Sequence, residues 1–102
     1  MATLHHNISG ELTQELLAPG DNVVVSQVTL TNVHGTNLCR VDLYIEKKLT
    51  GKFYLLKNSQ LNKGVTLIYD RLRFSNAVDE FGLYIKLTKS ASETPTVDVV
   101  IA

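Results

Sequence analysis

Apolar and polar residues alternate one by one along most apolar stretches of this 102-residue chain. Successive side chains of a β-strand point to opposite sides of the sheet, so the alternation predicts strands with one buried face. Three long stretches carry the pattern most fully. Their expected inward-facing residues are Val24, Ser26, Val28 and Leu30, then Cys39, Val41, Leu43 and Ile45, and finally Phe81, Leu83, Ile85 and Leu87.

Turn-forming residues divide the chain into short strands at fairly even spacing, which is typical of a sandwich or a barrel rather than of a fold with crossover helices. The expected strands cover residues 23–32, 38–47, 52–57, 65–69, 80–88 and 96–102. We therefore predict an all-β, single-domain antiparallel β-sandwich of about eight strands with a jelly-roll-like topology.

Residues 1–17 are treated as an N-terminal segment ahead of a sandwich domain at residues 18–102. Leu12 and Leu16 have the spacing of one helix face, but the residues between them also alternate as a strand does. Gly10 before this stretch and Pro19-Gly20 after it leave little room for a stable helix. We therefore expect a strand or an extended arm.

Composition excludes several classes of function. Ten acidic and ten basic residues give a net charge of zero, so the sequence does not support nucleic-acid binding through a basic surface. No stretch approaches the ~20 apolar residues of a membrane helix. The first residues lack the basic and apolar regions of a signal peptide. Cys39, the single cysteine, is expected to be a small buried hydrophobe in a protein that folds in a reducing cytoplasm.

No pattern of residues predicts a catalytic, cofactor or metal site. His5 and His6 are adjacent, and adjacent side chains on a strand point to opposite faces, so they do not converge on one metal. The carboxylates are scattered along the chain, whereas acid–base catalysis needs them to converge in a cleft. We therefore expect no enzymatic activity and no cofactor.

Apolar residues also occupy positions that a monomeric sandwich would keep polar. Four of these residues are predicted to lie on an outer face and to form an interface: Tyr54, Leu56, Ile68 and Val100. Several strands with two apolar faces suggest a subunit-contact surface, and a second sandwich layer or a barrel interior is the alternative. The residues expected to be almost fully buried are Leu43, Phe53, Leu55, Leu83 and Ile85.

The order of these segments resembles that of small β-sandwich virion structural proteins of tailed bacteriophages, over roughly residues 16–102. Val28-Thr29-Leu30-Thr31-Asn32, a turn and Cys39-Arg40-Val41-Asp42-Leu43-Tyr44-Ile45 are similar to the opening of such proteins. Phe53-Tyr54-Leu55-Leu56-Lys57-Asn58 followed by Leu61-Asn62-Lys63-Gly64-Val65-Thr66-Leu67 is similar to their middle. Asp79 before a strand and the final Val97-Asp98-Val99-Val100-Ile101 are similar to their end.

The resemblance implies a structural subunit of a virion, made in the cytoplasm of a host bacterium. Its partners would be further copies of itself and other virion proteins, such as the major capsid protein or tail proteins. The absence of fibre-like repeats favours capsid decoration over a tail, neck or fibre-associated role. A carbohydrate-binding or host-receptor-binding module is the alternative from a different functional class.

Overall fold

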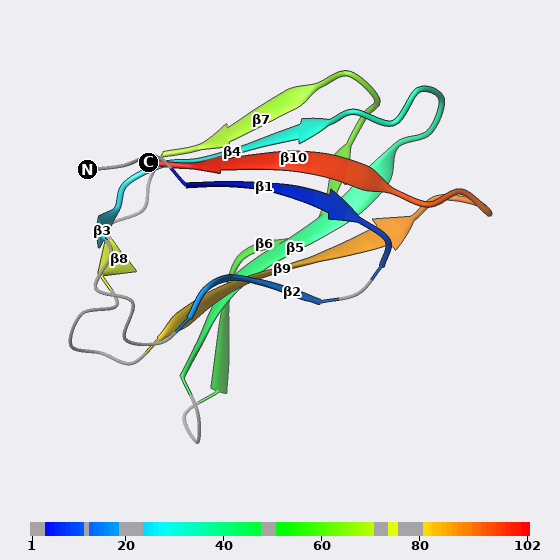
Figure 1. Ribbon diagram of the computed structural model, residues 1–102. Coiled ribbons are helices and arrows are strands. Elements are labelled where there is room, and N and C mark those ends of the chain that lie inside the picture. The colour runs from blue at the N-terminus through cyan, green and yellow to red at the C-terminus, as the bar shows by residue number, and fades with distance from the viewer. Residues whose placement is uncertain (1–3, 12, 19–23, 48–50, 71–73, 76–80) are drawn as a thin grey trace.

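The computed structural model describes residues 4–11, 13–18, 24–47, 51–70, 74–75 and 81–102 (Figure 1). All of the regular structure in these residues consists of β-strands. The strands are β1 (Leu4–Ser9), β2 (Gln14–Leu17), β3 (Val24–Val25), β4 (Val28–Asn32), β5 (Cys39–Lys47), β6 (Gly51–Leu61), β7 (Thr66–Tyr69), β8 (Phe74–Ser75), β9 (Gly82–Lys89) and β10 (Thr96–Ile101). No helix in the described residues is long and apolar enough to cross a membrane.

The strand pairs are nested like the two halves of one long hairpin. β1 pairs with β10, β2 with β9, β3 with β8, β4 with β7 and β5 with β6, all antiparallel. Two further pairings, β10 with β4 and β9 with β5, close this hairpin into two four-stranded sheets. We call them sheet A (β1-β10-β4-β7) and sheet B (β2-β9-β5-β6).

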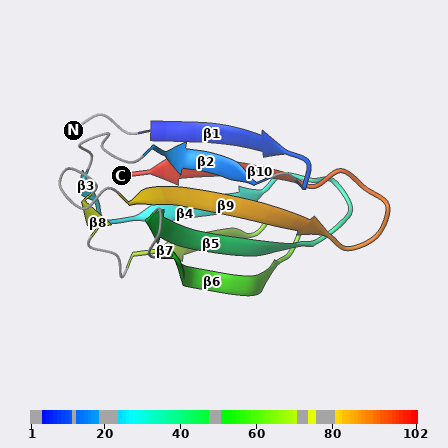
Figure 2. The same cartoon turned by 90° about the horizontal axis from the view of Figure 1, so that it is seen from below.

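The two sheets lie face to face, as Figure 1 and the turned view in Figure 2 show. A long antiparallel hairpin that is rolled into two such sheets is a jelly roll. The predicted antiparallel sandwich is therefore confirmed. β1 and β2 of the N-terminal segment are strands that pair with β10 and β9, near the other end of the chain.

The core fills the space between the sheets. It contains the inward residues of the central strands, including Leu43, Leu83 and Ile85, which have no exposed surface. The predicted inward register of β5 and β9 is correct here, because each of these strands has paired neighbours on both sides that hold its register.

The strand predicted over residues 23–32 is interrupted, so its expected register is wrong in the first half. The backbone N–H groups of Ser26 and Gln27 both donate to the carbonyl oxygen of Ala102, at 2.8 and 3.0 Å. This contact separates β3 from β4. Ser26 is exposed and Val25 is buried, whereas alternation had placed Ser26 inside. The side chain of Val24 lies outside the described part.

β6 also departs from simple alternation. Its register against β5 shifts twice, because Val41 pairs with Ser59, Leu43 with Leu56, and Tyr44 with Tyr54. Each extra residue in a bulge turns the following side chains to the other face. Leu56 therefore lies opposite the buried Leu43 and packs against the core, so its predicted position on an outer face is wrong.

Two residues of the predicted core are less buried than expected. Leu55, the extra residue of one bulge, is half-buried and packs against the core. Phe53 is 50 % exposed, although it pairs with the inward-register Ile45. In Figure 1 the first part of β6 points away from sheet A, so Phe53 lacks a covering sheet. Its ring contacts the ring of Phe81 edge to face, with 6.0 Å between centroids.

Candidate functional site

Two of the four predicted interface residues, Val100 and Ile68, lie on the outer surface of sheet A with Thr29 between them. Val100 of β10 pairs with Thr29 of β4, and Thr29 pairs with Ile68 of β7. On the other side, Val100 pairs with His5 of β1. These four residues form one row across all four strands. Ile68 is 58 % exposed and Val100 is 40 % exposed, so the apolar part of the row is open to solvent.

A second row of polar residues runs beside the first. Asn7 pairs with Asp98, Asp98 with Thr31, and Thr31 with Thr66. The Asn7 amide donates to the Asp98 carboxylate at 2.6 Å, and the hydroxyls of Thr31 and Thr66 are 2.9 Å apart. The polar groups of this row therefore satisfy one another. We call the two rows face A: His5, Asn7, Thr29, Thr31, Thr66, Ile68, Asp98 and Val100.

Tyr54 lies on the opposite side of the molecule, on the outer surface of sheet B. It pairs with Tyr44 of β5, and Tyr44 pairs with Tyr84 of β9. The ring centroids are 5.3 Å apart for Tyr44 and Tyr54, and 5.6 Å apart for Tyr44 and Tyr84. Glu15 of β2 continues the row beyond Tyr84. Tyr44, Tyr54 and Tyr84 form what we call the tyrosine row.

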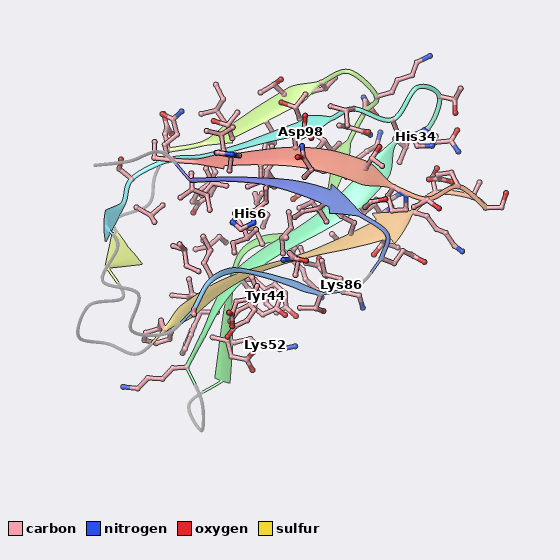
Figure 3. The ribbon with its side chains drawn as sticks, viewed as in Figure 1. His6, His34, Tyr44, Lys52, Lys86 and Asp98 are labelled. Carbon is pink, nitrogen blue, oxygen red and sulfur yellow. The ribbon has the colours of Figure 1, made fainter. Side chains whose placement is uncertain are left out.

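Charged side chains of both signs surround the tyrosine row. The ammonium of Lys52 lies 5.0 Å from the centre of the Tyr44 ring, and that of Lys57 lies 4.4 Å from the Tyr54 ring. Lys57 also contacts the Asp42 carboxylate at 3.7 Å. We call this surface face B: Glu15, Asp42, Tyr44, Glu46, Lys52, Tyr54, Lys57, Tyr84 and Lys86. Figure 3 shows Tyr44, Lys52 and Lys86 on this outer side.

The sequence did not predict the tyrosine row, although it indicated that two of its members face outward. The alternation places Tyr44 and Tyr84 on the outer register of two long strands. That β5 and β9 are neighbours, with Tyr44 directly opposite Tyr84, depends on pairing between residues forty positions apart. Alternation along one strand carries no information about its partner. The predicted interface set is therefore divided among face A, face B and the core.

The structure places His5 and His6 on opposite faces of β1 and buries Cys39. His5 is exposed on face A, and His6 turns inward, where Nε2 lies 3.2 Å from the carbonyl oxygen of Leu16 (Figure 3). Cys39 is buried; desolvation and then the charge of Glu93 raise the pKa of its thiol. Among the described residues, no group of three or more His, Cys, Asp or Glu side chains could hold a metal ion.

No protein-family model and no curated protein matches the chain, but solved structures share its fold. PirA is 11% identical with a TM-score of 0.64, covering 97% of this chain and 94% of that one. The Yersinia pseudotuberculosis-derived mitogen is 14% identical with a TM-score of 0.56, covering 99% and 83%. A chain of the T13 IBDV viral particle is 11% identical with a TM-score of 0.53, covering 98% and 30%. At these identities the likeness concerns the fold alone, and one such fold belongs to a viral particle.

The arrangement provides two different outer surfaces for binding. Face A has one carboxylate among its eight residues, and an asparagine already donates to it. A carboxylate that has a hydrogen-bond donor costs less to bury than one without a partner. Face B combines aromatic rings with several charges, so it can select a partner by charge as well as by shape.

Proposed function

We propose that the chain is a non-enzymatic structural subunit of a bacteriophage virion, made in the cytoplasm of the host bacterium. It attaches through face A to neighbouring virion proteins or to further copies of itself. Capsid decoration is the favoured position, and a tail or neck position is the alternative. The observation that carries the proposal is the row of exposed Ile68 and Val100 on a face with a single carboxylate.

Three features support attachment through face A. Two of the exposed apolar residues, Ile68 and Val100, share one row of sheet A, whereas singly scattered apolar residues would need no explanation. The polar row beside them is internally hydrogen-bonded, so burial leaves few groups without partners. The jelly roll is shared with a chain of a viral particle, which agrees with a virion role.

The alternative role, a carbohydrate-binding or host-receptor module, needs open aromatic ring faces. Tyr44 is only 4% exposed, and lysine ammonium groups lie over the rings of Tyr44 and Tyr54. A sugar would have to displace these ammonium groups before it could stack on either ring. The structural role is therefore the better supported of the two.

The test measures binding of the purified chain to particles that were assembled without it. Capsids and tails are separated, each is mixed with the chain, and bound protein is measured by co-sedimentation. We expect Ile68→Asp and Val100→Asp to fold and to lose binding, because each buries a carboxylate in the contact. The expected loss is at least about 2 kcal/mol, roughly 30-fold in affinity.

The matched control is Thr88→Asp, which adds the same charge at an exposed position on the outer side of sheet B. It should bind as the unchanged chain does. Equal binding by the Ile68→Asp, Val100→Asp and Thr88→Asp chains would contradict attachment through face A. Binding of the unchanged chain to neither capsids nor tails would contradict the virion role itself.

A further inference from the structure

The ring of Tyr84 lies against Gly82, two residues earlier on the same strand. A Cβ atom at Gly82 would lie 2.6 Å from Oη and 2.7 Å from Cε2 of Tyr84. The far end of the ring therefore rests on the backbone of its own strand, and only a residue without a side chain leaves room for it. The ring also stacks with that of Tyr44, with 5.6 Å between centroids and 20° between the ring planes, and Tyr84 is partly exposed.

Two carboxylates flank this ring. Glu15 lies opposite Tyr84 on β2, and Glu46 lies opposite Gly82 on β5. Burial, followed by the charge of Glu15, a side-chain hydrogen bond with Glu15 and the charge of Glu46, raises the pKa of Tyr84. Both carboxylates are thus close enough to act on the ring electrostatically. A cation on the ring would be attracted by them and by the ring itself.

The other two rings of the row already bind cations in this way. Lys52 lies over Tyr44 and Lys57 lies over Tyr54. Among the described residues, no lysine or arginine is placed over Tyr84. We propose that Tyr84, between Glu15 and Glu46, receives the guanidinium group of an arginine from a protein partner.

Arginine fits this position better than the alternatives do. Its planar guanidinium can stack on a ring while its N–H groups donate to carboxylates at its edge, whereas an ammonium cannot do both in one plane. A neutral sugar could use the ring face but would gain little from the two charges.

The experiment is an amide NMR titration of the isolated chain with Nα-acetyl-arginine amide. Nα-acetyl-citrulline amide, which has nearly the same shape without the charge, is the ligand control, and methyl glucoside is the neutral sugar. We expect saturable shifts of the β9 amides near Tyr84, with a dissociation constant for arginine in the millimolar range. The citrulline ligand should bind at least about fivefold more weakly than the arginine ligand.

Two variants locate the site. Glu46→Gln should weaken arginine binding about fivefold, because it removes one of the two negative charges beside the ring. Gly82→Ala should weaken it by a similar factor, because the added methyl group displaces the ring of Tyr84 without removing it. Asp70→Asn, which removes a carboxylate after β7, is the matched control and should bind arginine unchanged.

Equal binding of citrulline and arginine would overturn the proposal, and so would unchanged binding by Glu46→Gln. If methyl glucoside bound more tightly than the arginine ligand and shifted the same amides, Tyr84 would be a sugar-binding site instead. The inference rests on the proposed function only in taking the partner to be a protein. Because the titration uses the isolated chain, a negative titration would not count against attachment through face A. A negative particle test would likewise not count against arginine binding at Tyr84.

Discussion

Asn32 organises the turn that follows β4 and is the buried polar residue of the described part of the chain. Its amide nitrogen donates to the carbonyl oxygens of Leu61 and Asn37, at 2.9 and 3.1 Å. Its side-chain oxygen accepts the N–H of His34 at 2.9 Å. An amide can supply two donors and an acceptor at once, and an apolar residue of similar size would remove all three of these hydrogen bonds.

Glu93 holds the turn between β9 and β10 in a similar way. Its carboxylate accepts the backbone N–H groups of Ser90 and Ala91, each at 2.9 Å, and the hydroxyl of Ser90 at 3.1 Å. The backbone hydrogen bond from Ser90 is the main cause that lowers the pKa of Glu93 to about 2. The folded turn therefore favours the ionised form of this side chain.

This shift predicts how stability depends on pH. A group whose pKa is lowered by folding stabilises the folded state above its unfolded pKa, and this contribution disappears as pH falls toward the folded pKa. The Glu93 contribution should thus be present at neutral pH and be lost between about pH 5 and pH 2. Thermal melts of the unchanged chain and of Glu93→Gln should differ at neutral pH and converge across this window. A difference in melting temperature that stays constant with pH would contradict the assignment.

At the scale of elements, the central strands β5 and β9 specify the sandwich. Each pairs on both sides, and the inward residues of β9, Leu83, Ile85 and Leu87, have no exposed surface. The edge strand β6 pairs only with β5, and this is the strand that carries the two register shifts. An edge strand has one partner to set its register, so bulges are tolerated there.

Leu83→Ala tests the role of the central strand. The substitution removes a fully buried side chain and leaves a cavity between the sheets, so the free energy of unfolding should fall by ~2–5 kcal/mol. Denaturant unfolding followed by circular dichroism measures this loss. Val65→Ala, at an exposed position that is 45% accessible, is the control and should change stability little. Equal stability of Leu83→Ala and the unchanged chain would refute the inward register of β9.

At the scale of the whole molecule, the jelly roll separates two chemically different surfaces by one layer of core. Face A is formed by β1, β10, β4 and β7, and face B by β2, β9, β5 and β6. One surface is almost without charge, and the other combines tyrosines with carboxylates and lysines. If the protein attaches to particles through face A, as proposed, face B remains open on the opposite side of the molecule.

The separation predicts that the two surfaces act independently. Ile68→Asp should abolish attachment to particles and leave arginine binding at Tyr84 unchanged, whereas Glu46→Gln should do the reverse. Changes at distant sites without shared partners combine additively, so the double variant should show both losses and no more. Co-sedimentation and the NMR titration on the same four proteins measure this. A loss of both activities in either single variant would show that the faces are coupled through the core.

The sequence by itself determined the properties that depend on neighbours along one strand. Alternation at Leu43, Leu83 and Ile85 indicated the buried face correctly, because a strand places every second side chain on one side. The same rule indicated that Tyr44 and Tyr84 face outward and that Ile68 and Val100 are exposed. Turn residues at even spacing indicated short strands in a sandwich or a barrel rather than a fold with crossover helices.

Only the tertiary structure decided the properties that depend on which strands are neighbours. The bulges of β6 turned Leu56 toward the core, against which it packs, and the lack of a covering sheet left Phe53 exposed. Pairing of β5 with β9 and β6 brought three tyrosines into one row, and pairing of β10 with β4 and of β4 with β7 aligned Val100 with Ile68. These contacts join residues that are far apart in the chain. Their register is fixed by the packing of the two sheets rather than by local pattern, because a shift of one residue reverses every side chain that follows.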